Sequence, residues 1–196
     1  MEIVIHRINN LSDLNNIPKK YGCEIDIRSR GSKLILNHDP YLSGDYLFDY
    51  LDNYMHGLLV LNIKEAGIEN DVLKAVRERG IGSYFLLDVE IPYLYNASRL
   101  GERAIAVRFS EDEPIEFVKN YSKLIDWVWI DTNTKLPLDE NNISEIILLK
   151  SCLVCPERWG RPQDIATYRH KMFEMGFEPN AVMTNLKYIN NWEKEI

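Results

Sequence analysis

The sequence predicts a single compact (β/α)8 barrel, the TIM-barrel class of α/β fold, spanning residues 1–196 with short loops. Short apolar segments alternate with amphipathic ones along the whole chain, which is typical of parallel strands joined by helices. Eight such strands favour closure into a barrel, in which all strands end on one face. An open doubly wound sheet is the structural alternative, although no G-x-G-x-x-G motif follows the first predicted strand.

The N-terminal half is expected to begin with a strand over 2–6. Ser12 is a candidate cap for the helix that follows, and Gly80 a candidate stop for the last helix of this half. The turn after the second strand is expected over 28–32. The predicted strands are 2–6, 23–28, 33–37 (a hairpin-like return) and 57–62, and the predicted helices are 12–19, 45–54 and 65–79.

The C-terminal half continues the same alternation. Pro92, Pro114 and Pro162 each stand where a helix is expected to begin, a position that proline tolerates. The predicted strands are 83–87, 103–108, 126–130, 151–154 and 181–183. The predicted helices are 91–99, one opened by Pro114, 139–150 and 162–175, followed by a short polar tail.

Composition excludes several classes of partner. The net charge of −7 argues against broad nucleic-acid binding, which needs a basic surface, so an anionic substrate must be drawn by local cations. No apolar run is long enough for a membrane anchor, and the charged N-terminus is unlike a signal peptide. The three cysteines, with Cys152 and Cys155 on opposite faces of a strand, are expected to be buried thiols of a cytoplasmic protein.

The second predicted strand carries the most informative residues. Glu24 and Asp26 are separated by one residue in an apolar setting, so a side-chain period of two directs both carboxylates to one face. Two neighbouring carboxylates repel each other unless a cation lies between them. A hard metal ion such as Mg²⁺ or Ca²⁺ is the simplest cation that suits oxygen ligands.

Histidines and cations, which could act together with these carboxylates, follow the other predicted strands of the N-terminal half. His6 and Arg7 end the first strand, His38 and Asp39 follow the return strand, and the third apolar run ends in Asn62-Ile63-Lys64. Arg7 and Lys64 are the cations suited to phosphoryl oxygens. The later strand ends add Asp88, Glu90, Arg108, Asp131, Glu157, Thr184 and Asn185.

These motifs together resemble the glycerophosphodiester phosphodiesterase family, and more loosely the surrounding phosphatidylinositol-specific phospholipase C-like superfamily. The family pattern is His-Arg-Gly, Glu-x-Asp, His-Asp and Glu-x-Lys. Here it reads His6-Arg7-Ile8, Glu24-Ile25-Asp26, His38-Asp39 and Asn62-Ile63-Lys64, over about the first third of the chain. Ile8 replaces the family's Gly, and Asn62 replaces a metal-binding Glu.

The resemblance implies metal-assisted hydrolysis of a small or lipid-derived phosphodiester. It assigns His6 and His38 as base and acid, Arg7 and Lys64 to the substrate phosphate, and Glu24, Asp26 and Asn62 to Mg²⁺ or Ca²⁺. In the family the attacking group is often a neighbouring hydroxyl of the substrate, which gives a cyclic phosphate. Asn62 offers an oxygen without charge, so metal affinity is expected to be lower than with three carboxylates. Glu65, Asp88 and Glu90 are candidates to compensate.

Two alternatives follow from the same residues. A non-catalytic or weakly active barrel would bind a phosphorylated sugar or a lipid headgroup, for instance in surface-polysaccharide metabolism. A sugar-phosphate isomerase would instead bind phosphate through backbone amides after the seventh and eighth strands. The oligomeric state cannot be inferred from the sequence.

Overall fold

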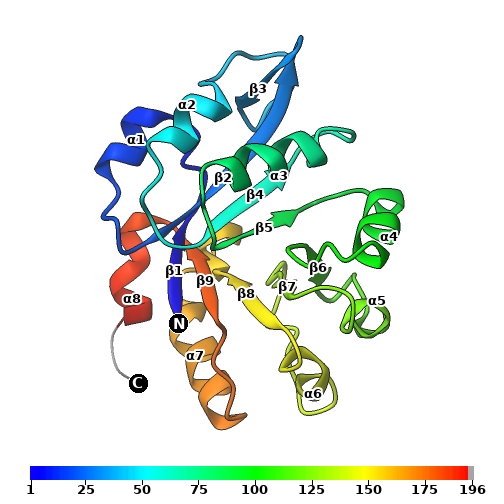
Figure 1. Ribbon diagram of the computed structural model, residues 1–196. Helices are drawn as coiled ribbons and strands as arrows, with labels where there is room; N and C mark the ends of the chain where they lie inside the picture. Colours follow the sequence, from blue (N-terminus) through cyan, green and yellow to red (C-terminus); the bar gives the residue numbers. More distant parts are fainter. Residues whose placement is uncertain (194–196) are drawn as a thin grey trace. The chain divides into compact units, whose positions relative to one another are not determined.

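The computed structural model describes residues 1–193 and has the predicted (β/α)8 fold (Figure 1). The order of neighbouring strands is β5-β4-β2-β1-β9-β8-β7-β6, so the first strand lies beside the last, as it does in a barrel. The strands are β1 (Glu2–Ile5), β2 (Gly22–Arg30), β3 (Lys33–Leu36), β4 (Leu59–Ile63), β5 (Tyr84–Leu87), β6 (Ala106–Phe109), β7 (Trp127–Ile130), β8 (Lys150–Val154) and β9 (Ala181–Thr184). Strand β3 folds back antiparallel on β2, as the predicted return strand.

Helices connect the parallel strands. They are α1 (Leu11–Asn16), α2 (Leu47–Asp52), α3 (Glu69–Glu78), α4 (Ile91–Arg99), α5 (Ile115–Tyr121), α6 (Ile143–Ile146), α7 (Asp164–Glu174) and α8 (Ile189–Glu193), with 3₁₀ turns at Pro156–Trp159 and Leu186–Tyr188. No helix within residues 1–193 is long and apolar enough to cross a membrane. All three cysteines are buried and free, as the sequence predicts.

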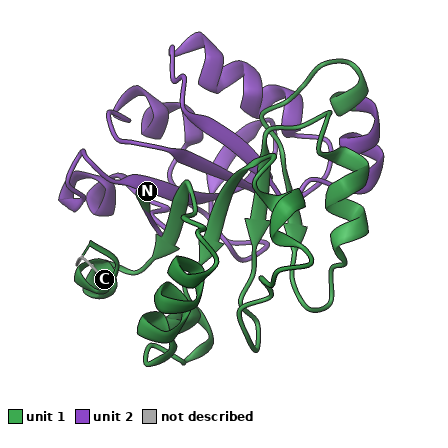
Figure 2. Ribbon diagram, turned by 90° about the horizontal axis from the view of Figure 1, so that it is seen from below, with its two compact units in different colours: residues 1–3, 97–196 green, residues 4–96 purple. Residues whose placement is uncertain are grey.

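The chain divides into two compact units, which Figure 2 distinguishes by colour. Residues 4–96 form one unit, built on β2 and β4. Its core contains Ile25, Ile27 and Leu61, whose side chains are wholly buried. Residues 1–3 and the chain from Ala97 onward form the other, with Val128 and Leu153 among its buried strand residues. The candidate site lies within residues 4–96.

Gly22 fixes how closely β2 approaches the chain that leads into β4. A Cβ atom at this position would lie 2.2 Å from the carbonyl oxygen of Leu58, closer than any real side chain tolerates. The absence of a side chain therefore lets the two segments pair. In the resulting parallel register Asp26 lies opposite Asn62. This register brings the Glu24-Ile25-Asp26 and Asn62-Ile63-Lys64 motifs side by side.

Several predicted boundaries were wrong, for local reasons. Strand β2 continues to Arg30, so the turn is shorter than 28–32. The cap of α1 is Asn10 and not Ser12, because the Asn10 side chain accepts the Asp13 N–H at 2.8 Å. Helix α3 begins at Glu69 and not at 65, since Gly67 adopts a left-handed φ of 95°.

The C-terminal half departs from prediction in two helices. Only Ile143–Ile146 is helical within the predicted 139–150 segment, because the Asp139 side chain accepts the N–H groups of Asn141 and Asn142 and turns the chain. The predicted polar tail contains α8. Its Trp192 is 2% exposed and donates to the Cys155 sulfur at 3.1 Å, so packing stabilises a helix there.

Candidate active site

Glu24 and Asp26 form a buried acidic pair at the centre of the site. Each is 1% exposed, and the two are separated by one residue within β2, so the side-chain period of a strand directs both to the same side. Ile25 and Ile27 pack on the other side of the strand and are wholly buried. Two carboxylates so deeply buried require partners that donate hydrogen bonds or bring positive charge.

Glu24 receives one hydrogen bond on each oxygen. The Asn62 amide donates to Oε1 at 2.8 Å, and the backbone N–H of Arg7 donates to Oε2 at 2.9 Å. Burial, and after it the charge of Asp26, raises the pKa of Glu24 to about 7, although these two bonds and the charge of Lys64 act to lower it. Glu24 therefore exchanges its proton near neutral pH.

Asp26 is held by two cations and one amide. The Lys64 ammonium lies 3.2 Å from Oδ1, and the Arg7 Nε lies 3.8 Å from Oδ2. Asn9 binds Asp26 twice, since its amide donates to Oδ2 at 2.8 Å and its carbonyl oxygen accepts the Asp26 backbone N–H at 2.8 Å. Nothing in the sequence singles out Asn9, which is one polar residue in a loop after β1.

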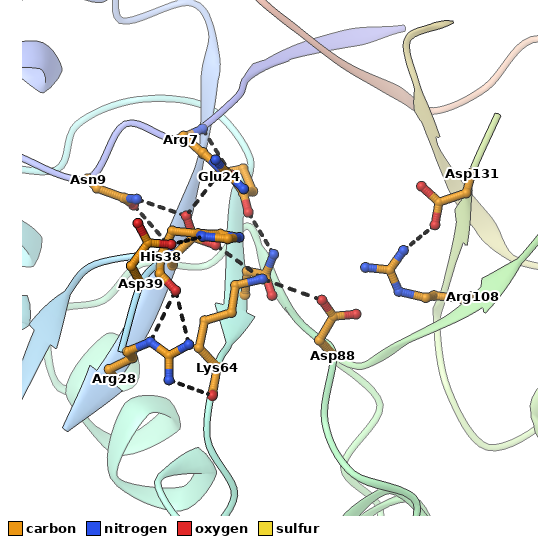
Figure 3. Close-up of polar contacts among 12 residues, drawn as sticks. Arg7, Asn9, Glu24, Arg28, His38, Asp39, Lys64, Asp88, Arg108 and Asp131 are labelled. Atoms are coloured by element: carbon orange, nitrogen blue, oxygen red, sulfur yellow. Dashed lines mark hydrogen bonds and ion pairs between the residues drawn. The ribbon is translucent and has the colours of Figure 1, made fainter. Parts of the chain in front are cut away.

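Asp88 joins the cluster through Lys64. Its Oδ2 lies 3.6 Å from the Lys64 ammonium, which therefore stands between two carboxylates (Figure 3). Asp88 has a left-handed φ of 60°, a conformation uncommon for a residue with a side chain. Glu65, Asp88 and Glu90 were the candidates to supply the negative charge that Asn62 lacks. Among the described residues, Asp88 is the one for which a contact with the site is seen.

The chain turns sharply where β1 ends. Arg7 has a φ of 56°, and this conformation directs its N–H to the Glu24 carboxylate. Ile8 is 6% exposed, and its N–H donates to the Glu24 carbonyl oxygen at 2.9 Å. The left-handed residue of this turn is thus Arg7, so an Ile at position 8 is compatible with the turn. His6 is half-buried directly between β1 and Arg7.

His38 lies in the loop after β3, along the same edge of β2 as the turn after β1. Its Nδ1 lies 2.7 Å from Asp39 Oδ1, and this hydrogen bond lowers the pKa of the Asp39 carboxyl. The loop is tied to β2 because the Asn37 N–H donates to the Asp26 carbonyl oxygen at 3.0 Å. The side chain of Arg28 donates to the His38 carbonyl oxygen (Figure 3).

The side-chain oxygens of the site suit a hard metal cation only if Asn62 supplies one of the ligands. Among residues 1–193, no three His, Cys, Asp or Glu side chains gather to hold a metal. Asn62, however, is 7% exposed, and its Oδ1 has no hydrogen-bond donor in the part of the chain that the structure describes. A half-turn of this amide would direct Oδ1 toward Glu24. Carboxylate and amide oxygens from Glu24, Asp26 and Asn62 then match the ligands of Mg²⁺ or Ca²⁺.

In the unit that contains residues 97–193, the polar side chains at the strand ends bond mainly to one another. Arg108 forms a short ion pair with Asp131. Glu157 accepts from the Thr184 hydroxyl at 2.8 Å and from the Asn185 backbone N–H at 2.9 Å. The Asn185 amide is thereby engaged within the protein, which disfavours the phosphate site expected of a sugar-phosphate isomerase.

Comparisons with known proteins support the fold. No protein-family model and no curated protein sequence matches the chain. Its structure is similar to the crystal structure of a glycerophosphodiester phosphodiesterase from Agrobacterium tumefaciens, with a TM-score of 0.66 and 13% identity over 94% of this chain and 96% of the other. A candidate glycerophosphoryl diester phosphodiesterase from the same organism gives a TM-score of 0.64 and 9% identity over 98% of both chains. The fold implied by the motifs is confirmed.

Proposed function

We propose that this protein is a metal-assisted phosphodiester hydrolase of the glycerophosphodiester phosphodiesterase type, acting on a small or lipid-derived substrate. The observation that carries the proposal is the buried Glu24–Asp26 pair beside the cations Arg7 and Lys64. This cluster lies at strand ends of a fold that two proteins named for this activity share. The order and spacing of the four sequence motifs support the same activity.

Arg7 and Lys64 are suited to bind the phosphodiester anion. Their side chains are 35% and 16% exposed, so both reach solvent, whereas the Asp26 carboxylate beside them is 1% exposed. A guanidinium and an ammonium at one site would neutralise the charge that a phosphodiester carries toward its attacking group. Asp88 holds the Lys64 ammonium from the side away from Asp26.

The residues that would hold a divalent cation are Glu24, Asp26 and Asn62. Mg²⁺ or Ca²⁺ bound there supplies further charge neutralisation at a phosphoryl oxygen. Glu24 must lose its proton to act as a ligand, so metal binding would be coupled to release of this proton and would weaken as pH falls.

His6 and His38 are proposed as the base and the acid. An ionised Asp39 only accepts hydrogen bonds, so the 2.7 Å contact keeps the proton of a neutral His38 on Nδ1. Its Nε2 is then the atom that exchanges a proton with the substrate. One histidine takes the proton of the attacking hydroxyl, and the other protonates the leaving alkoxide.

Asn62 favours one alternative, a barrel that binds a phosphorylated sugar or lipid headgroup with little or no turnover. Its amide donates to Glu24 at 2.8 Å, so one proton donor stands where a third carboxylate would add negative charge. A site with fewer carboxylates retains Arg7 and Lys64 for an anion but holds a divalent cation less tightly.

Hydrolysis assays separate these functions. Bis(p-nitrophenyl) phosphate and glycerophosphodiesters would be tested with Mg²⁺, Ca²⁺ or EDTA, using the wild type, His6→Ala and Asn62→Glu. The matched control is His170→Ala, because this histidine is exposed on α7 and pairs with Glu174 of the same helix. Calorimetric titration with each metal would measure binding independently of turnover.

Each outcome has a distinct meaning. Metal-dependent turnover that is lost in His6→Ala and kept in His170→Ala supports the hydrolase. An inactive wild type that Asn62→Glu activates favours the binding function. Absence of turnover and of metal binding in every form would overturn the proposal.

A further inference from the structure

The guanidinium of Arg28 lies where three segments of the site meet. It extends from β2, two residues beyond Asp26, and reaches the loops after β3 and β4. Its Nε and Nη2 donate to the His38 carbonyl oxygen at 3.1 and 3.0 Å, and its Nη1 donates to the Lys64 carbonyl oxygen at 3.0 Å (Figure 3). One side chain therefore connects the loop of a proposed acid–base residue to that of a proposed phosphate-binding cation.

Backbone hydrogen bonds to the sheet fix Lys64 directly but do not fix His38 directly. Lys64 is fixed by its own N–H, which donates to the Ile27 carbonyl oxygen at 3.0 Å. Within residues 1–193, the N–H of His38 makes no such bond to the sheet. Among the described residues, Arg28 makes every hydrogen bond that joins His38 to a residue outside the loop over 37–46. The loop of His38 is tied to β2 through the Asn37 N–H, but the backbone of His38 itself is held relative to Lys64 by Arg28.

We propose that Arg28 is a positioning residue that sets the place of His38 relative to Lys64. The inference rests on the proposed function, because it concerns the same site. Arginine is the residue type that this role requires, since its planar fork presents several N–H donors in fixed directions. A lysine at position 28 would keep the charge but could not hold both carbonyl groups in one geometry.

The consequence for catalysis is a selective loss of rate. Displacing His38 misaligns proton transfer while Arg7 and Lys64 still bind the phosphate. In Arg28→Lys, kcat is therefore expected to fall roughly 10–100-fold with little change in KM. A merely structural arginine would instead lower the amount of folded protein and leave the properties of that protein unchanged.

The matched control is Arg30→Lys. Arg30 lies two residues further along β2, and its guanidinium has no partner in the part of the chain that the structure describes. Both variants, and Arg28→Gln as a second test, would be compared by kinetics with bis(p-nitrophenyl) phosphate. The His38 ring resonances, assigned with His38→Gln, would be followed by NMR. Millimolar guanidinium would be added to Arg28→Ala to test for rescue of activity.

The proposal expects the His38 resonances to shift in Arg28→Lys and Arg28→Gln but not in Arg30→Lys, with rescue by guanidinium. Unshifted His38 resonances together with kcat equal to that of Arg30→Lys would overturn it. An inactive wild type would count against the proposed hydrolase only. The NMR comparison would then decide the role of Arg28 by itself, with shifted resonances supporting it and unshifted ones refuting it.

Discussion

The Lys64 ammonium lies 3.2 Å from Oδ1 of Asp26, and that carboxylate is 1% exposed. The pair is the strongest electrostatic contact of the acidic cluster, because the second carboxylate on Lys64, that of Asp88, is 3.6 Å away. A buried charge that loses its partner is strongly destabilising, so this contact should govern both folding and phosphate binding.

Replacing Lys64 with Met should therefore destabilise the protein by about 2–4 kcal/mol at pH 7 and abolish phosphate binding. Urea unfolding and titration with inorganic phosphate would measure the two effects. Lys74→Met is the control, since Lys74 is 72% exposed and contacts only Glu78 on the same helix at 3.9 Å. Equal stability of the two variants would contradict the electrostatic role of Lys64.

Glu24 should make stability fall as pH rises toward neutrality. Its pKa is raised from 4.5 to about 7 in the folded protein, so the folded state binds more protons than the unfolded state between these values. This contribution is fully present below about pH 4.5 and is lost as pH rises through 7, an effect of about 3 kcal/mol. Metal must be removed with EDTA for this comparison.

The substitution Glu24→Gln removes the carboxyl group whose protonation makes stability depend on pH. A neutral Gln can accept the Arg7 N–H and, once the Asn62 amide turns by half a rotation, donate to Asn62 Oδ1. We expect the variant to lose less stability than the wild type between pH 5 and pH 7, measured by urea unfolding at each pH. Parallel pH profiles for both proteins would refute the assignment to Glu24.

Asn9 should contribute to stability although it carries no charge. Replacing it with Ala removes two hydrogen bonds of 2.8 Å to a buried aspartate, which predicts a loss of about 1–3 kcal/mol and lower activity. Thermal and urea unfolding would measure the stability. Asn16→Ala provides a comparison, because the Asn16 amide bonds only the exposed Ser12 carbonyl oxygen within α1. If the two substitutions have the same effect, Asn9 does not orient Asp26.

Gly22→Ala should disturb the register that assembles the site. The added methyl group would meet the Leu58 carbonyl oxygen at 2.2 Å, so the strands must separate at a cost of about 1–3 kcal/mol. Activity should fall with stability, since β2 carries Glu24 and Asp26. In Gly82→Ala the new Cβ atom meets nothing within 4 Å, and we expect little change. Unfolding midpoints and turnover of both variants would provide the comparison.

The elements that the sequence predicted best are those with a clear period. Strand alternation placed Glu24 and Asp26 on one face, and Gly80 marked the end of α3 closely, although the helix begins at Glu69 and not at 65. The predicted helix over 139–150 was wrong because Asp139 and Asn142 use their side chains to turn the backbone, a competition that periodicity does not reveal.

The candidate site was only partly predictable, because some of its residues are brought there by loops and not by a motif. His6, Arg7, Lys64 and the acidic pair belong to motifs with recognisable spacing. Asn9 and Arg28 belong to no motif, and their roles depend on where loops close over β2. The metal ligands and histidine roles stay predictions that the variants above test.

The sequence by itself determined the alternation of strands and helices and the shared face of the acidic pair, because both follow from local periodicity. Only the tertiary structure decided that Asn62, 38 residues away, donates to Glu24 and that Arg28, 36 residues from Lys64, holds its carbonyl group. Such contacts are set by strand register and loop closure. These in turn depend on the packing of the whole sheet rather than on neighbouring residues.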